Sequence, residues 1–273
     1  MRRILPFLII LTSVCEIFSL ETHETASALI ENFRDEMYMQ RIDDAALRRM
    51  YRETLVMLDG LDLDEQELLY RKSQAAYYMA RAYLAFDTTE EVLASDEAFR
   101  SGRFKAVQSR YERLEEIVQL LEESMSFSEQ YLMKERDARG IRQYAESLSQ
   151  ITTLKTIGYL ISNGPKIQSL AQEAIELDPG EIKAHMLIAS RYIYSPSIFG
   201  GNPAKGIDII EAIVQRSFPD REDAHNINIA LGVANLKLDR WLEAAHHFQK
   251  AQKIYPGNVY SAAMLLLCES KLE

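Results

Sequence analysis

The side chains best suited to catalysis or metal binding are the histidines, the cysteines and a group of acids near residue 220. His246 and His247 are adjacent, so on a helix they point about 100° apart and cannot share one metal ion as a pair at spacing four could. The acids precede a predicted helix, where carboxylates are favourable, and we interpret the group as solvated loop residues: Asp220, Glu222, Asp223 and His225. The sequence therefore predicts no metal site.

The remaining candidates are better explained by packing. His185 occupies a packing position of a predicted helix, where we expect it to be partly buried, and Cys268 lies among leucines on an apolar face, as core cysteines do. No Gly-x-Ser-x-Gly motif occurs, so a serine nucleophile has no support. We expect no catalytic residue and no cofactor, and we expect that the protein is not an enzyme.

The elements that carry these residues are predicted to be helices. The chain has 273 residues, of which 47% are hydrophobic, while Gly 11 and Pro 7 are few for a protein built of strands and tight turns. The formal net charge of −10 and the lack of a basic run exclude nucleic acid as a partner, because phosphate binding needs clustered Lys and Arg. These features predict an all-α fold.

Residues 1–19 have the pattern of a secretory signal peptide. Two arginines precede an apolar run at 4–14 that is too short to span a bilayer comfortably, and Ser19 closes the segment at the expected cleavage site. Two alternatives stay open: a buried N-terminal helix, or a bacterial lipoprotein signal with the lipid on Cys15, although Val14 is bulky for that signal. We expect export to the periplasm or cell envelope, with membrane association only if Cys15 is lipidated.

The stretch 225–258 has small and large apolar residues at regular offsets. Counted from His225, they are Leu231 at 7, Gly232 at 8, Ala244 at 20, Phe248 at 24, Ala251 at 27 and Pro256 at 32. Two antiparallel helices approach closely only where Gly or Ala faces the partner helix, and larger side chains fill the space beside them. This spacing resembles the tetratricopeptide repeat, a helix–turn–helix unit of about 34 residues. The resemblance implies a right-handed α-solenoid of stacked helix pairs.

Equivalent helix ends at Pro179 and Pro256 place three repeats and a capping helix, at 148–181, 182–220, 225–258 and 259–273. Residues 20–147 are predicted to be a divergent helical part of the same solenoid, with helices at 47–58, 74–85, 88–99 and 106–125. A Gly-Gly turn splits the middle repeat, and we interpret it as a linker, with Asn202 capping the next helix and Pro203 at its first position.

The resemblance also implies where a partner binds, because the first helices of such repeats line a concave groove that takes extended peptides or partner helices. The matching positions are Ser149, Thr152, Thr156, Tyr159, Lys183, Met186, Ser190, Tyr194, Asn226, Ile229, Val233 and Leu236. From these we select as candidate partner-binding residues Tyr159, Lys183, Met186, Ser190, Tyr194, Asn226, Ile229 and Val233. One lysine is too few to clamp an acidic tail. The apolar positions on the last repeat have an alternative, namely cover by the cap or a neighbouring helix.

These features predict an exported tetratricopeptide-type scaffold that binds a protein or peptide. A narrower alternative is similarity to the periplasmic T-component of tripartite ATP-independent transporters, a helical repeat protein that partners the substrate-binding subunit. Lipidation at Cys15 and a trimeric assembly would favour it. A third alternative is a helical lytic or peptidase enzyme, which would need a carboxylate or metal cluster in the groove. The sequence specifies neither the identity of the partner nor the oligomeric state.

Overall fold

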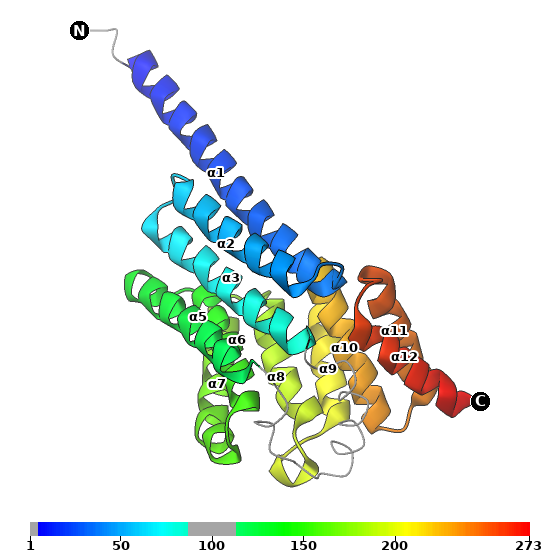
Figure 1. The fold of residues 1–273 in the computed structure, drawn as a ribbon. Coiled ribbons are helices and arrows are strands. Elements are labelled where there is room, and N and C mark those ends of the chain that lie inside the picture. Colours follow the sequence, from blue (N-terminus) through cyan, green and yellow to red (C-terminus); the bar gives the residue numbers. More distant parts are fainter. Residues whose placement is uncertain (1–4, 87–112) are drawn as a thin grey trace.

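The protein is all-helical over the residues that its computed structural model describes, 5–86 and 113–273, with side chains described for 21–84, 113–156 and 158–273. The helices follow one another along the chain and pack mainly against their sequence neighbours (Figure 1). They are α1 Leu5–Met39, α2 Asp44–Gly60, α3 Glu65–Phe86, α5 Leu114–Lys134, α6 Ala138–Leu154, α7 Ile157–Leu177, α8 Ile182–Tyr194, α9 Pro203–Val214, α10 Arg221–Lys237, α11 Trp241–Ile254 and α12 Val259–Leu272, with a short 3-10 helix at Ser197–Phe199. No strand interrupts this described part, so the expected all-α class is confirmed.

Short polar side chains begin most of these helices. Asp43 accepts a hydrogen bond from the backbone N–H of Ala46 at the start of α2, and Asn202 does the same for Lys205 at the start of α9. Pro203 occupies the first turn of α9, where its missing N–H costs nothing. The predicted cap of the Gly-Gly turn is therefore confirmed.

The two C-terminal helix pairs form where the apolar spacing predicts them. A Cβ on Gly232 of α10 would lie 2.7 Å from the Phe248 ring of α11, so only glycine permits this close approach. At the crossing of α8 and α9, a Cβ on Gly206 would lie 2.4 Å from Ile193. The helix α12 follows at Val259–Leu272, in the place of the predicted capping helix, and Cys268 is buried there as expected.

The register proposed for 148–181 is wrong. It requires one helix across residues 155 and 156, but α6 ends at Leu154 and α7 begins at Ile157. Thr156 starts the new helix instead, because its hydroxyl accepts a hydrogen bond from the Tyr159 backbone N–H. The helix pair is therefore α6 with α7, and Tyr159 lies on the second helix of that pair.

Helices α3, α5 and α6 approach closely around buried serines. Ser73 and Ser128 are 2.7 Å apart between hydroxyl oxygens, and Ser124 and Ser147 are 2.8 Å apart. Small side chains allow this approach, and the hydrogen bonds satisfy the buried hydroxyls. These contacts hold both α3 and α6 against α5, and α3 and α6 carry polar residues of the site described below. The predicted helices at 47–58 and 74–85 lie within α2 and α3; the one at 88–99, and 106–112 of the next, lie outside the described residues.

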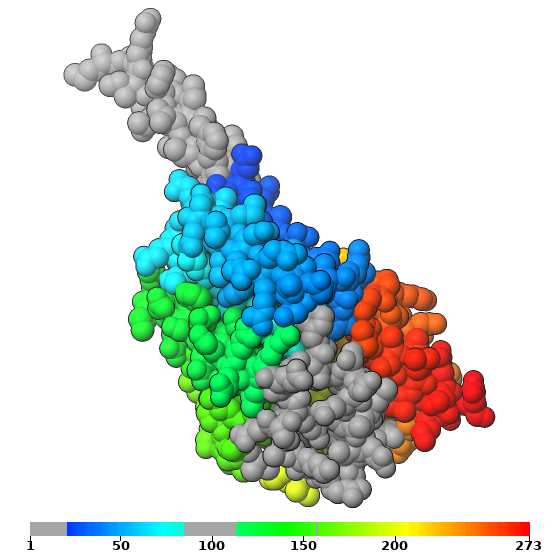
Figure 2. All heavy atoms as spheres, viewed as in Figure 1, coloured from blue at the N-terminus to red at the C-terminus, as the bar shows by residue number. Residues whose placement is uncertain are grey.

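The end of α1 joins the C-terminal helices, as the meeting of blue and orange surfaces in Figure 2 illustrates. The backbone N–H of Val259 donates to the Gln40 side-chain oxygen at 2.7 Å, and Tyr255 donates its hydroxyl proton to Asp35 at 2.7 Å. Gly257 lies so close to the Met39 carbonyl that no Cβ could fit between them. The two ends of the helical stack are thereby tied together.

Helix α1 continues through the cleavage position predicted after Ser19. Export and signal-peptide cleavage therefore stay predictions. Among the helices described, none combines the length and the apolar character that crossing a bilayer would require.

Candidate functional site

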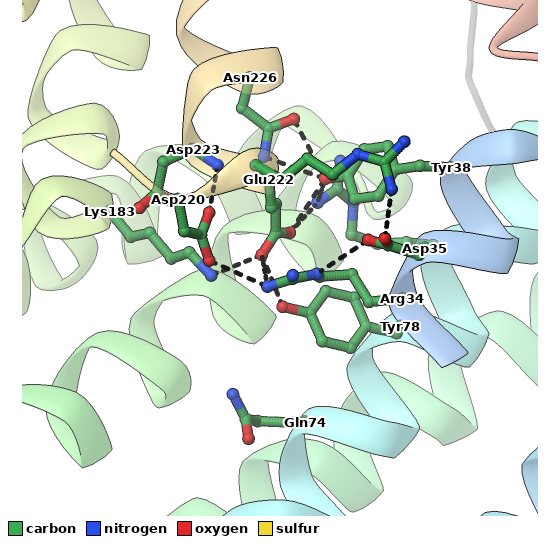
Figure 3. Close-up of polar contacts among 12 residues, drawn as sticks. Arg34, Asp35, Tyr38, Gln74, Tyr78, Lys183, Asp220, Glu222, Asp223 and Asn226 are labelled. Carbon is green, nitrogen blue, oxygen red and sulfur yellow. Dashed lines mark hydrogen bonds and ion pairs between the residues drawn. The ribbon is translucent and has the colours of Figure 1, made fainter. Parts of the chain in front are cut away.

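A buried carboxylate, Glu222, lies at the centre of a network of polar side chains from four helices (Figure 3). Asp220 caps α10, and Glu222 falls in the first turn, where the helix turns it inward to an exposure of only 1%. His225 is buried one turn further on. The interpretation of this group as solvated loop acids is therefore wrong for Glu222 and His225.

Both carboxylate oxygens of Glu222 are saturated. Its Oε2 accepts hydrogen bonds from the Lys183 ammonium on α8 at 2.6 Å and from the Tyr78 hydroxyl on α3 at 2.7 Å. Its Oε1 accepts from the Tyr38 hydroxyl on α1 at 3.0 Å and from Arg81 on α3 at 3.5 Å. A buried carboxylate is stable only with such partners, because loss of hydration is otherwise uncompensated.

The charges in this network set its protonation states. Burial by itself raises the pKa of Glu222, but the charges of Lys183 and Arg81 and the hydrogen bonds from Lys183 and Tyr78 outweigh it and lower the pKa to about 2. Burial lowers the pKa of His225 to about 4, although its hydrogen bond to the Ala251 carbonyl opposes this. At neutral pH, Glu222 is ionised and His225 is neutral.

A second set of contacts extends the network to the end of α1. Arg34 donates to Asp220 at 3.0 Å, and its guanidinium nitrogen is 3.7 Å from Glu222. Asn226 bonds the Tyr38 hydroxyl at 2.9 Å, and the Tyr38 ring stacks on Tyr255 with 4.8 Å between centroids. Polar side chains therefore lie at the centre of the interface between α1 and the C-terminal helices.

Five side chains around Glu222 keep hydrogen-bonding capacity that the described chain does not use. They belong to α3, α6, α8 and α10, and each is coupled electrostatically to at least one of the others: Tyr77, Arg81, Glu146, Lys183 and Asp223. We call these five residues the inner-face site. Its charged side chains are enclosed by helices yet keep a small exposed fraction, for example 24% for Arg81.

The structure brings only some of the predicted groove residues together. Lys183 and Asn226 join the Glu222 network, where each already has an internal partner. Met186 and Ile229 are half-buried and pack against the core shared by α8 to α12, whereas Val233 is 6% exposed and belongs to that core. Val233 is thus not a groove residue, and the alternative of cover by neighbouring helices holds for it.

The other predicted positions lie outside this network. Ser190 and Tyr194 lie further along α8, and the Tyr194 side chain is 36% exposed. Tyr159 is half-buried at the start of α7, with the Lys155 ammonium 5.6 Å from its ring centre.

The remaining candidates for chemistry have structural environments. His185 is partly buried, as predicted, with a ring nitrogen 3.1 Å from the Pro179 carbonyl oxygen. His246 and His247 pack edge to face at 5.9 Å between centroids. Within the described ranges, no three His, Cys, Asp or Glu side chains are grouped to hold a metal ion.

Sequence reasoning missed the residues that matter most here. The signal was a pair of polar or aromatic side chains four positions apart on one helix, such as Tyr77 with Arg81 on α3 and Arg142 with Glu146 on α6. Such spacing places both side chains on one helix face. It identifies a polar inward face, but it does not identify the partners.

Comparison with models of known protein families gives no match. A search of curated proteins likewise finds no significantly similar sequence.

Proposed function

We propose that this chain is an exported scaffold, a right-handed solenoid of tetratricopeptide-type helix pairs, that binds a segment of another protein on its inner face. The observation that carries the proposal is the inner-face site, where side chains from four separate helices converge with unused hydrogen-bonding capacity. Sequential helix pairing and the glycine contacts at the two C-terminal crossings support the repeat assignment. On this proposal the protein has no turnover of its own.

Site-specific photo-crosslinking in intact cells tests this function. A photoreactive amino acid at Ser190, a predicted groove position on α8, should capture a discrete partner. The matched control is the same amino acid at Asp208, which is exposed on α9. A protein adduct at Ser190 and none at Asp208 would support inner-face binding. Equal labelling at both positions, or none at Ser190, would refute it.

The transporter alternative differs in partner and assembly. A T-component-like protein would be lipidated at Cys15 and trimeric, so intact-mass measurement and size-exclusion chromatography with light scattering separate the two proposals. An unlipidated monomer would favour the general scaffold.

A further inference from the structure

We propose that one edge of the helical stack binds the surface of a membrane that contains anionic lipids. This inference goes beyond the proposed protein-binding function. The edge is formed by the turn between α6 and α7 and the turn between α8 and α9, which lie at the same end of the helices in Figure 1. We call it the turn edge, and its residues are Leu160, Ile161, Arg191, Ile198, Phe199 and Lys205.

The register of α7 against α8 brings the two turns to one level. Gln168 on α7 donates a hydrogen bond to the Leu187 carbonyl on α8 at 3.4 Å. The two helices run in opposite directions. Ile161 and Tyr194 each lie seven residues, or about 10 Å, from this contact toward the same end. The start of α7 and the turn after α8 therefore reach the same edge of the stack.

Large apolar side chains are exposed along the turn edge. On the turn after α8, Ile198 is 85% and Phe199 50% exposed, and at the start of α7, Ile161 is 61% and Leu160 41% exposed. Single exposed apolar residues are ordinary on protein surfaces, whereas a group of them on neighbouring turns is typical of an interaction site. The turn edge therefore has the apolar character of a binding surface.

The backbone holds Ile198 and Phe199 in this exposed position. The N–H groups of Phe199 and Gly201 donate to the Pro196 carbonyl at 2.9 and 3.1 Å. A Cβ on Gly201 would lie 1.9 Å from the Ser195 carbonyl oxygen, so the turn requires glycine there. These contacts use backbone atoms only, so the side chains of Ile198 and Phe199 can be replaced without breaking the turn.

Positive charge borders these apolar side chains. Arg191 and Lys205 are exposed on the two sides of the turn, where their charged groups lie 5.8 and 4.3 Å from the centre of the Tyr192 ring. Neither cation forms an ion pair with a carboxylate among the residues that the structure describes. Asp and Glu are absent from 147–172 and from 182–207, although the chain has 41 of them. The turn edge is therefore locally basic on an acidic protein.

Charge complementarity identifies an anionic lipid surface as the partner. The net charge is −10, and the turns at the opposite edge carry acids, at Asp178, Glu181 and Asp220. An anionic surface repels most of the protein and attracts the turn edge, so it orients the molecule. The exposed apolar side chains then enter the boundary of the acyl chains, while the two cations and the amphipathic Tyr192 stay at the level of the headgroups.

The test is flotation of the purified full-length protein with vesicles of phosphatidylcholine alone or of phosphatidylcholine and phosphatidylglycerol in equal amounts. The protein should float with the mixed vesicles, and added salt should weaken this binding. Arg191→Glu and Phe199→Ser should each weaken binding about fivefold or more, because one reverses a charge at the headgroups and the other removes a buried ring. Far-UV circular dichroism confirms that each variant folds.

The matched controls lie on the turn between α9 and α10, at the opposite edge, where Arg216 and Phe218 are exposed. Arg216→Glu and Phe218→Ser should each change binding by less than about twofold, since α9 holds them about 18 Å from the turn edge, beyond the screening length at moderate salt.

Tryptophan fluorescence locates the contact. The emission of Phe199→Trp should shift to shorter wavelength on mixed vesicles and be quenched by brominated lipids, whereas that of Phe218→Trp should do neither. Each spectrum is compared with that of the wild type, which has one Trp.

Three results overturn the inference. The first is that the protein does not float with the mixed vesicles. The second is equal binding by Arg191→Glu and Arg216→Glu, or by Phe199→Ser and Phe218→Ser, because another part of the chain, such as the apolar run at 4–14, then makes the contact. The third is equal binding to both kinds of vesicle, which would remove the role of anionic lipid. Crosslinking at Ser190 is a separate experiment, so the scaffold function can fail while membrane binding stands, and the reverse.

Discussion

Replacing Glu222 with Gln should destabilise the protein strongly, because it removes a buried negative charge that both Lys183 and Arg81 contact directly. Breaking a buried ion pair by removing one partner costs about 3–5 kcal/mol. A pKa lowered from 4.5 to about 2 corresponds independently to about 3 kcal/mol at neutral pH. For a chain of this length, that loss lowers Tm by roughly 6–20 °C.

Thermal and urea unfolding followed by circular dichroism measure this effect at neutral pH. Glu211→Gln on α9 is the control, with an expected change within about 0.5 kcal/mol. If Glu222→Gln unfolds with the midpoint of the wild type, the network does not contribute to stability and the reasoning about buried charge is refuted.

The pH dependence provides a second check on the same residue. Because the folded-state pKa of Glu222 is lowered, its contribution is present above pH about 4.5 and is lost as the pH falls toward 2. The wild type should therefore lose more stability across this range than Glu222→Gln does. Parallel declines of the two proteins would contradict the assignment.

Three further predictions concern single sites. Asp223→Asn should stabilise the unliganded protein at neutral pH by up to about 3 kcal/mol, since a raised carboxyl pKa costs stability once the pH exceeds the ordinary value; urea unfolding measures it. Gly232→Ala should destabilise by about 1–3 kcal/mol, because the new methyl group meets the Phe248 ring, and thermal unfolding detects this. Asn202→Ala should cost about 1 kcal/mol by removing the hydrogen bond from the Lys205 backbone N–H, whereas Asn202→Ser should retain most of it.

Each of these predictions has a contrary outcome. A less stable Asp223→Asn protein would mean that this carboxylate has a structural partner. An unchanged Gly232→Ala protein would show that α10 and α11 can move apart freely. If the Ala and Ser variants at residue 202 are equally stable, the cap hydrogen bond is not the cause of the stability lost in Asn202→Ala.

The helical class and the C-terminal helix pairs could be predicted because their signals are local. Gly232 on α10 and the apolar residues of α11 stand at the offsets expected for two packed helices. Asn202 followed by Pro203 is a helix-start signal contained in two adjacent residues. The break between α6 and α7 was not predicted. The repeat register counted back from Pro179 placed a continuous helix there, and the sequence signal for the break is a single capping residue, Thr156.

The candidate site could not be predicted because its contacts are remote in sequence. The partners of Glu222 lie 39, 144 and 184 positions away, at Lys183, Tyr78 and Tyr38. An acid near a helix start is usually solvated, and only the docking of α1 and α3 against α10 removes its water and brings cations to it. Local spacing therefore determined which segments become helices, whereas tertiary packing decided which acid is buried and paired.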